Sequence, residues 1–325
     1  QCSHATQVRY IDGERQVLGW RELAGEPSVK PWQDDGVYLI TGGLGGLGLI
    51  FAYEIARQAK GVTLVLTGRR ELDETGRRQV RELEALGARV EYRAADMANR
   101  ESVRTLVLQV QEEHEALNGI LHSAGVNRDS LLLKSTSAAL SEVLAAKVQG
   151  LMHLDEASRG IDLDCFICFS SLAGVLGNVG QAAYAAGNAF MDAYVAYQNS
   201  VPGTRRCRML TVNWPLWRDG GMQVDAATQQ AMTAATGMVP MRSESGIEAL
   251  YRALGSGLDQ LAVIEGRAAR IRQVLLDQPA STLMAKRVPT APIAPIAVAV
   301  AEVGNGLADQ AAQYLRKLLA NALQL

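Results

Sequence analysis

The sequence is poor in the features that would place it in several large protein classes. It has only four cysteines, at positions 2, 165, 168 and 207, and their spacing fits no disulfide framework, which indicates a reducing, cytoplasmic compartment. No run of about 18 apolar residues is free of charges and helix breakers, so we expect no membrane-spanning helix. The net charge of -2 supplies no excess of Lys and Arg for binding nucleic acid or an anionic membrane.

Metal ligands are also scarce. Cys165 and Cys168 lie three positions apart on a predicted strand, so their side chains should point to opposite faces. Neither a second cysteine pair nor a histidine partner stands at a zinc-ligand spacing, and the four histidines are scattered. We therefore expect both cysteines in the core and no metal.

What is present is the composition of a globular protein. Over 325 residues, 48% of positions are hydrophobic and 20% are charged, which is enough to bury a full core. Residues 8–18 alternate apolar and polar positions around Asp12-Gly13, and this pattern predicts a small hairpin with a tight turn. Residues 19–35 form a connector that contains Pro and Trp.

From residue 36 onward, short β-rich runs alternate with helical patterns. The predicted strands are 37–41, 62–67, 90–94, 119–122, 164–170, 208–213 and a late one near 261–265. The predicted helices are 46–59, 73–86, 100–114, 136–158 and 182–199. This alternation predicts a Rossmann-like α/β fold, a doubly wound parallel sheet with helices on both faces.

The end of the chain has a different character. Residues 284–304 are rich in Ala, Pro and Val without a regular period, which predicts an interdomain linker. Residues 305–325 resume the pattern of an amphipathic helix. We expect the main α/β domain to span 36–283.

A glycine-rich segment follows the first strand of the predicted sheet. It reads TGGLGGLG and is followed directly by an amphipathic helix. Glycines remove Cβ atoms that would collide with a pyrophosphate, and the helix N-terminus offers free N–H donors. Strand and helix flanks are the context that makes such a pattern a dinucleotide fingerprint. The expected cofactor contacts are Thr41, Gly42, Gly43, Leu44, Gly45, Gly46, Leu47 and Gly48.

The end of the second strand indicates which dinucleotide is bound. An acid there binds the ribose 2′-hydroxyl of NAD, whereas an arginine accommodates the 2′-phosphate of NADP. The strand here runs into Arg69-Arg70, with no carboxylate at its end. NADPH is therefore the expected cofactor, and the alternative is a pair of solvated surface arginines.

Two further strand ends complete the expected cofactor site. Asp96, followed by Met97, comes after the third strand, where this fold commonly hydrogen-bonds the adenine; a helix N-cap is the alternative role for Asp96. His122, Ser123 and Ala124 end the fourth strand, and small residues there let the backbone approach the adenosine. For the His122 side chain we favour a packing role over a catalytic one.

Four polar residues mark the expected catalytic site. Ser171 follows the fifth strand, at the sheet edge where ligands of such folds bind. Tyr184 and Asn188 lie four apart on the next helix and so share a face. Lys147 lies on the helix before the serine strand.

These residues carry a family resemblance. The segments KVQG, FSSLAGVLGNVGQAAYAAGNAFMDA and NWPLW resemble ketoreductase domains of modular polyketide synthases, a branch of the short-chain dehydrogenase/reductases. Most of that superfamily has Tyr-x-x-x-Lys, whereas this sequence has Tyr184-x-x-x-Asn188 with the lysine, Lys147, on the preceding helix, as the synthase branch does. The resemblance covers about residues 36–275. The residues at 34–38, DDGVY, also resemble synthases that are supplied by separate acyltransferases.

The chemistry of ketone reduction accounts for these residue types. Hydride transfer creates an alkoxide that needs a proton, and tyrosine has a reference pKa of about 10. A nearby Lys147 ammonium would lower the pKa of the Tyr184 phenol. Ser171 would donate a hydrogen bond to the keto oxygen. Asn188 is expected to hold a water or to orient Lys147.

The resemblance also implies a substrate and a product. The substrate would be a β-ketoacyl thioester on the phosphopantetheine arm of an acyl carrier protein, reduced to the β-hydroxyacyl thioester. Asp129 matches the last acid of the family's Leu-Asp-Asp motif, and Leu176 replaces the tryptophan that lies eight residues before the tyrosine. This combination implies a B-type reductase that forms the D-alcohol. Gln181, Trp217 and Met222 are the other expected substrate or lid residues.

The resemblance also implies to which domains the two ends of the chain belong. Residues 1–35 resemble the tail of the structural subdomain that precedes such reductases, and 305–325 resemble a truncated first helix of a carrier protein. The partners would be the carrier protein and other domains of the same synthase. Two alternatives remain open, an inactive structural ketoreductase domain and a freestanding short-chain carbonyl reductase.

Overall fold

The computed structural model describes residues 8–17, 19–23, 30–126, 130, 134–203 and 205–276. The chain divides into two compact units. The sheet unit is drawn from 25–223 and 240–264, and the small unit from 1–24, 224–239 and 265–321. The expected linker, 284–304, and the expected C-terminal helix, 305–325, lie outside the described residues.

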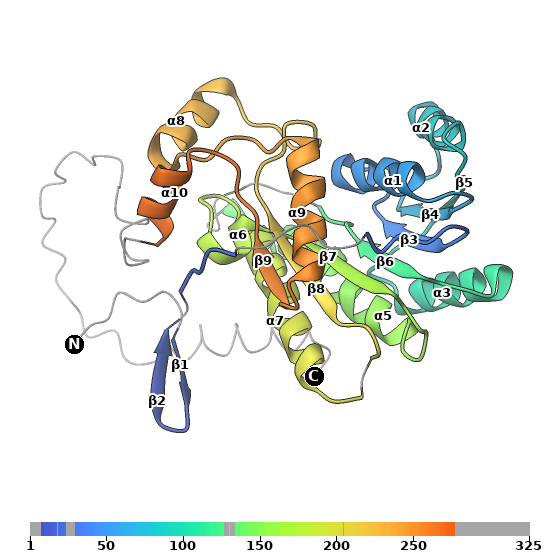
Figure 1. Ribbon diagram of the computed structural model, residues 1–325, viewed down its shortest axis with the longest axis horizontal. Coiled ribbons are helices and arrows are strands. Elements are labelled where there is room, and N and C mark those ends of the chain that lie inside the picture. The colour runs from blue at the N-terminus through green and yellow to red at the C-terminus, as the bar shows by residue number, and fades with distance from the viewer. Residues whose placement is uncertain are drawn as a thin grey trace, which may run out of the picture. The chain divides into compact units, whose positions relative to one another are not determined.

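The sheet unit is built on seven parallel strands in the order β5-β4-β3-β6-β7-β8-β9 (Figure 1). The strands are β3 (Val37–Thr41), β4 (Thr63–Gly68), β5 (Arg89–Ala94), β6 (Gly119–His122), β7 (Cys165–Ser171), β8 (Met209–Trp214) and β9 (Gln260–Ala262). All seven predicted strands are confirmed within a few residues. The chain winds outward from β3 through β4 and β5 and then returns to place β6 on the other side of β3. Ligands of such sheets bind at this switch point, outside the carboxyl ends of the strands.

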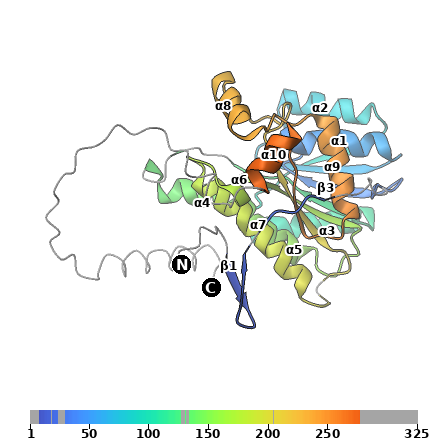
Figure 2. The same cartoon turned by 60° about the vertical axis from the view of Figure 1, so that its left-hand side comes forward.

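Helices cover both faces of the sheet (Figures 1 and 2). One face packs against α1 (Gly46–Gln58), α2 (Glu74–Glu84) and α9 (Ser243–Gly255). The other face packs against α3 (Arg100–His114), α5 (Gln149–Ala157) and α7 (Ala182–Ser200). The predicted doubly wound architecture is therefore confirmed.

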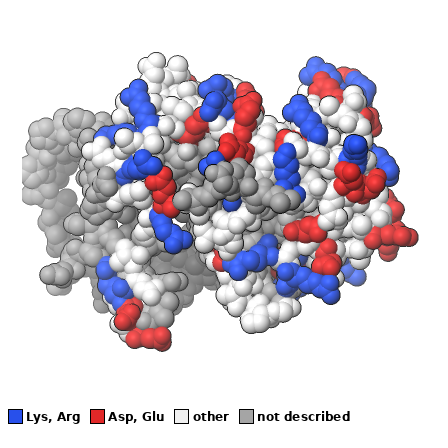
Figure 3. Space-filling model, viewed as in Figure 1, with Lys and Arg blue, Asp and Glu red and all other residues white. Residues whose placement is uncertain are grey.

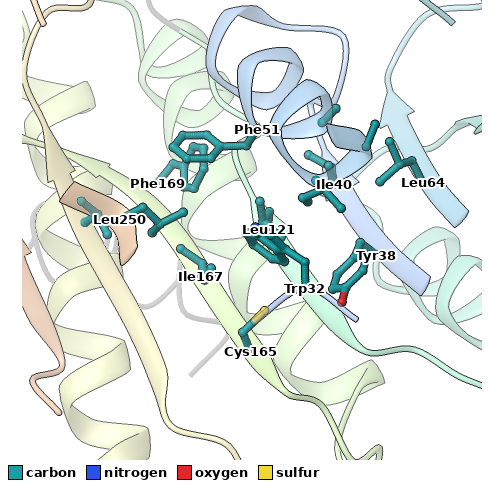
Figure 4. Packing of buried hydrophobic residues seen from close by; sticks show 14 of the residues in the cluster. Trp32, Tyr38, Ile40, Phe51, Leu64, Leu121, Cys165, Ile167, Phe169 and Leu250 are labelled. Atoms are coloured by element: carbon teal, nitrogen blue, oxygen red, sulfur yellow. The ribbon is translucent and has the colours of Figure 1, made fainter. Parts of the chain in front are cut away.

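Alternation along the strands explains the two cores. Cys165 belongs to the cluster beside α1, and Cys168 belongs to the cluster on the opposite face, as their spacing predicts. In the first cluster, Phe51 of α1 meets the Phe169 ring edge-on with centroids 5.0 Å apart (Figure 4). Both cysteines are buried, so the predicted core role is confirmed.

The prediction of one helix over 136–158 is wrong. The segment forms α4 (Ser137–Lys147) and α5 (Gln149–Ala157), which are separated at Val148. Gly150 is the second residue of α5, and a Cβ there would lie 3.0 Å from the Cβ of Met97, so α5 passes close to the chain after β5. The break leaves Lys147 in the last turn of α4, where the helix dipole favours a cation.

The small unit contains the predicted hairpin, β1 (Val8–Ile11) and β2 (Glu14–Val17). Asp12 and Gly13 both have positive φ angles, 51° and 81°, as a two-residue type I′ turn requires. The unit also contains α8 (Ala226–Thr236) and α10 (Ala268–Leu275). None of the helices in the described residues has the length and apolar character needed to cross a bilayer. Lys and Arg side chains are interspersed with Asp and Glu over the face shown in Figure 3.

Candidate active site

Tyr184, Asn188 and Lys147 meet where α4 packs beside α7. The Nζ atom of Lys147 lies 5.5 Å from the centroid of the Tyr184 ring. Asn188, one turn further along α7, donates a hydrogen bond from Nδ2 to the backbone oxygen of Tyr184 at 2.7 Å. The structure therefore brings together three of the four residues that the sequence singled out.

Lys147 is almost completely buried, with 3% of its surface exposed. Its Nζ donates a hydrogen bond to the backbone oxygen of Phe169 on β7 at 3.1 Å. Burial lowers the pKa of Lys147 to about 8, and the charges of Cys168 and Asp192 act in the opposite direction. An ammonium held in a dry site beside a phenol is able to favour the phenolate, which is what an acid catalyst requires.

Asn188 has an unfilled acceptor. The side chain is fully buried, and its Oδ1 has no hydrogen-bond partner among the described residues. A buried acceptor without a donor costs free energy, so this position suits a bound water or a substrate-linked donor. The geometry is compatible with the water-holding role expected for Asn188.

Ser171 is the last residue of β7 and the N-cap of the short helix α6 (Leu172–Leu176). Its Oγ accepts a hydrogen bond from the backbone N–H of Ala173 at 3.2 Å. Because the hydroxyl accepts in this bond, its own proton remains able to donate to a keto oxygen. Ser171 lies at the carboxyl edge of the sheet, as the sequence predicted.

A second layer of buried polar residues lies behind these four, and the sequence reasoning missed it. Asn213 of β8 donates from Nδ2 to Asp192 Oδ2 at 2.7 Å, to Ser170 Oγ at 2.9 Å and to the Ser171 backbone oxygen at 3.0 Å. Ser170 in turn donates to the backbone oxygen of Asn188 at 3.3 Å. The available signal was helical spacing, since Asp192 follows Asn188 by four positions.

The glycine-rich loop has little room for side chains. Gly42 has a φ angle of +65°, and a Cβ on Gly48 would lie 2.4 Å from the backbone oxygen of Gly42. Gly45 is the N-cap of α1, and no side chain accepts from the N–H groups of the first turn. A cradle of bare backbone donors at a helix N-terminus fits a dinucleotide pyrophosphate.

The loop that follows β8 lies against this cradle. A Cβ on Gly46 would lie 2.0 Å from the backbone oxygen of Gly220, and one on Gly220 would lie 2.6 Å from the Cβ of Trp217. Two backbones approach here at a distance that only glycines permit. No local pattern in the sequence indicates this contact between the loop after β8 and the nucleotide loop.

Arg69 and Arg70 are exposed at the end of β4. Arg69 forms a long ion pair with Glu142 of α4, 3.4 Å between Nη1 and Oε1. The backbone oxygen of Arg70 accepts from the Tyr92 hydroxyl at 2.5 Å, which holds the turn while the guanidinium remains exposed. Two exposed cations at this strand end fit a 2′-phosphate.

The residues expected around the adenosine differ in solvent exposure and in their hydrogen bonds. Asp96 is exposed and its Oδ1 accepts from the Ala98 N–H at 3.0 Å; the cap of α3 is Asn99, so the N-cap alternative for Asp96 is wrong. Met97 is buried. Ser123 donates from its hydroxyl to the backbone oxygen of Thr41 at 3.0 Å, and the Ala124 N–H donates to Thr41 Oγ1 at 3.2 Å.

His122 is a core residue. The ring is fully buried, with Nδ1 2.8 Å from the Thr41 hydroxyl. Burial, reinforced by the charge of Lys147, lowers the pKa of His122 to about 3, so the ring is neutral. The packing role favoured for this side chain agrees with its position, and only its backbone lies at the strand end.

The expected substrate residues are spread over several environments. Asp129 lies outside the described residues. Leu176 is half-buried at the end of α6, and Gln181 accepts a hydrogen bond from Asn178 at 2.9 Å between Oε1 and Nδ2. Met222 is exposed.

Trp217 requires a correction. Its ring is 3% exposed and packs in the core, with centroids 5.0 Å from Trp214 and 5.9 Å from Phe51. A Cβ on Gly246 of α9 would lie 2.1 Å from the indole. The side chain is therefore held inside the sheet unit, and the expected substrate contact does not agree with this position.

One group of potential metal ligands lies away from this site. Atoms of Glu91, Glu113 and His114 lie within 4.8 Å of one another. The Arg93 guanidinium lies 2.5 Å from both carboxylates, so a cation already balances their charge. Among the described residues, Arg93 therefore forms a structural ion-pair cluster with Glu91 and Glu113, and their charge needs no metal ion for balance.

Comparison with known proteins places this geometry in a family. The KR domain family matches residues 36–219. The chain is 48% identical to polyketide synthase PksN of Bacillus subtilis (strain 168) over 88% of its length, and 46% identical to PksL of the same organism over 83%. It spans 5% of the length of PksN and 6% of that of PksL.

Solved structures support the same family assignment. The structure resembles a ketoreductase domain from the bacillaene assembly line with a TM-score of 0.81 and 46% identity, over 83% of this chain and 65% of that one. It also resembles an N-terminal ketoreductase from the macrolactin assembly line, with a TM-score of 0.71, 38% identity and coverage of 81% and 50%. The chain therefore belongs to the KR domain family, the ketoreductase domains of polyketide synthases.

Proposed function

We propose that this chain reduces a β-ketoacyl thioester, carried on the phosphopantetheine arm of an acyl carrier protein, to the β-hydroxyacyl thioester with NADPH. The observation that carries the proposal is the buried Lys147 ammonium 5.5 Å from the Tyr184 ring. NADPH, when bound, supplies the hydride that adds to the keto carbon. The chain's own residues handle the oxygen and its proton.

The proposed roles follow from the contacts. Tyr184 gives its proton to the keto oxygen, and Lys147 stabilises the phenolate that remains. Ser171 donates a hydrogen bond to the same oxygen as charge develops on it. Asn188 offers its unfilled buried Oδ1 to a water that returns a proton to the site.

The preference for NADPH is part of the proposal. It is supported by the exposed Arg69 and Arg70 at the end of β4, a strand end without a carboxylate. Glu142 of α4 forms a half-exposed ion pair with Arg69. A phosphate is able to take the place of the Glu142 carboxylate in this pair.

We further propose a B-type reductase that forms the D-alcohol in a synthase supplied by separate acyltransferases. Leu176 in place of the family's tryptophan supports the product configuration, and similarity to PksN and PksL supports the synthase type. Other domains of that synthase and its carrier protein are the proposed partners. Chiral analysis of the alcohol formed from a diketide thioester tests the configuration, and the L-alcohol would contradict it.

The test of the main proposal is NADPH consumption with a β-keto thioester. The wild-type chain should oxidise NADPH faster than NADH, and Tyr184→Phe should lose about 10²–10⁴-fold in rate because the acid is removed. Equal rates for the two proteins would refute the role of Tyr184. No consumption by a folded wild-type chain would indicate an inactive structural domain, and equal activity on simple ketones would favour a freestanding carbonyl reductase.

A further inference from the structure

Asn213 is the last but one residue of β8, and its side chain is fully buried. A buried amide costs free energy unless both its nitrogen and its oxygen find hydrogen-bond partners. Both atoms of the Asn213 amide have partners, and these lie on β7, α7 and β9. The amide therefore connects β8 to three other elements of the sheet unit.

The bonds to β7 reach the end of the strand that carries the serine. Nδ2 of Asn213 donates to the backbone oxygen of Ser171 at 3.0 Å and to Ser170 Oγ at 2.9 Å. These two serines are the last residues of β7, and the pairing of β7 with β8 ends between Ser171 and Trp214. The amide thus adds side-chain bonds where the backbone ladder stops, and it holds the residue that carries the Ser171 hydroxyl.

The bonds to α7 reach the helix that carries Tyr184. Nδ2 of Asn213 also donates to Oδ2 of Asp192 at 2.7 Å, and a hydrogen bond to a carboxylate is stronger than one between neutral groups. Ser170 donates from its hydroxyl to the backbone oxygen of Asn188 at 3.3 Å. Asp192 and Asn188 lie on α7, two turns and one turn beyond Tyr184. The end of β7 is therefore joined to the tyrosine helix through this amide.

The partners permit one orientation of the amide. The backbone oxygen of Ser171 and the carboxylate of Asp192 can only accept, so the NH₂ group must face them. The amide oxygen then faces Gln260 of β9, whose Nε2 donates to it at 2.9 Å. An aspartate at position 213 would keep the shape and lose the donor.

We propose that Asn213 is a positioning residue of the reductase: its amide holds the end of β7 against α7 and so fixes the Ser171 hydroxyl relative to the Tyr184 phenol. The proposal rests on the proposed roles of Ser171 and Tyr184. Two groups that donate to one keto oxygen must both reach it, so their separation matters as much as their presence. Asn213 acts through Ser171 and supplies no group to the substrate.

The first experiment is a double-mutant cycle between Asn213→Ala and Ser171→Ala. With a β-keto thioester and NADPH, Asn213→Ala should lower kcat by about 10–100-fold, because a misplacement of ~1 Å at a reacting centre can cost about 10²-fold. KM for the thioester should change by less than about threefold, since no substrate contact is removed. In the Ser171→Ala background the same substitution should lower kcat by less than about twofold, because no hydroxyl remains to be positioned.

The chain offers a matched control in Asn199 of α7. Its Nδ2 donates to the backbone oxygen of Met209 at 2.8 Å and to Oδ1 of Asp259 at 2.6 Å, so it also joins α7 to β8 through a backbone oxygen and a carboxylate. Met209 is the first residue of β8, at the opposite end from Asn213. Both Asn199→Ala and Asn213→Ala should unfold at lower urea concentration, and only Asn213→Ala should lower kcat.

An exchange variant decides the matter if Asn213→Ala does not fold. Asn213→Asp with Asp192→Asn restores a donor and an acceptor between positions 192 and 213, but it leaves the Ser171 backbone oxygen without its donor. The urea midpoint should return close to that of the wild type, whereas kcat should stay low. A wild-type kcat in this exchange variant would show that the network has only a structural role.

Hydrogen–deuterium exchange tests the positioning without turnover. The backbone amides of α6, the helix that Ser171 caps, should exchange faster in Asn213→Ala and at the wild-type rate in Asn199→Ala. Unchanged exchange and unchanged kcat in folded Asn213→Ala, or an equal loss of kcat in the Ser171→Ala background, would overturn the role of Asn213. A folded wild-type chain that consumes no NADPH would refute the proposed function, and the exchange measurement would still test the link between Asn213 and Ser171.

Discussion

The nucleotide loop follows β3 and the catalytic pocket lies at the end of β7, two strands away in the sheet, and the two parts are built from different residues. The loop between β3 and α1 is mostly glycine, and added Cβ atoms there would lie close to other atoms, most of them backbone. The catalytic side consists of buried polar side chains from α4, β7, α7 and β8, among them Lys147, Asn188, Asp192 and Asn213. One part of the site is determined by steric fit and the other by charge and hydrogen bonding.

This difference predicts opposite responses to substitution. In the loop any added atom strains the backbone, so stability and cofactor affinity should fall together. In the pocket the Lys147 ammonium is kept in an apolar environment at a cost, so replacing it with an apolar side chain should affect activity far more than stability.

The strongest test in the pocket is Lys147→Met. The rate of reduction should fall by about 10²–10⁴-fold because the ammonium beside Tyr184 is lost. The free energy of unfolding should be unchanged or higher, since an apolar chain of similar length replaces a buried charge. Steady-state kinetics and urea unfolding measure the two quantities. A large loss of stability with an almost normal rate of reduction would contradict the contrast between the nucleotide loop and the catalytic pocket.

In the loop, the matching variant is Gly48→Ala. The new Cβ would lie 2.4 Å from the backbone oxygen of Gly42, and relieving the overlap should cost about 1–3 kcal/mol. The Kd for NADPH should rise by about 10–100-fold, with a parallel loss of stability. Gly19→Ala is the control, because no atom lies within 4 Å of the position its Cβ would take. Unaltered NADPH binding in titrations with Gly48→Ala would argue against the steric description.

The smallest effect should come from the exposed arginines. The double variant Arg69→Gln, Arg70→Gln should bind NADPH about tenfold more weakly and bind NADH as before, because only the 2′-phosphate contact is lost. Stability should change by less than about 0.5 kcal/mol. The control is Arg77→Gln, Arg78→Gln on α2, where both side chains are exposed. Equal losses of affinity for NADPH and NADH would mean that the 2′-phosphate of NADPH does not bind to Arg69 and Arg70.

Local patterns were sufficient for much of the fold. The strand from Val37 to Thr41, the helix from Arg100 to His114 and the opposite faces of Cys165 and Cys168 follow from periodicity alone. The break at Val148 did not, because Val148 itself keeps helical backbone angles, φ -84° and ψ -68°, and the close contact of Gly150 with Met97 is a tertiary one. Propensity is a weak guide where tertiary contacts decide.

The candidate site also contains residues that local patterns predict and residues that only tertiary contacts bring together. The glycine loop and the residues Lys147, Ser171, Tyr184 and Asn188 stand at recognisable spacings within the sequence. Asn213 meets Asp192 only because β8 pairs with β7 beneath α7, and no local pattern encodes that contact. Trp217 was misassigned for a related reason, since a tryptophan after a strand suits a lid or a core equally until its neighbours are known.

The contact between Gly46 and Gly220 has a consequence for the order in which the molecule is assembled. The nucleotide fingerprint is synthesised early, but the loop that packs on it follows β8, after four of the other strands have been made. A contact of such high sequence separation forms late, because the entropy of closing the intervening chain must be overcome first. During synthesis, a chain that has not yet reached Gly220 contains the complete fingerprint but not the finished cradle.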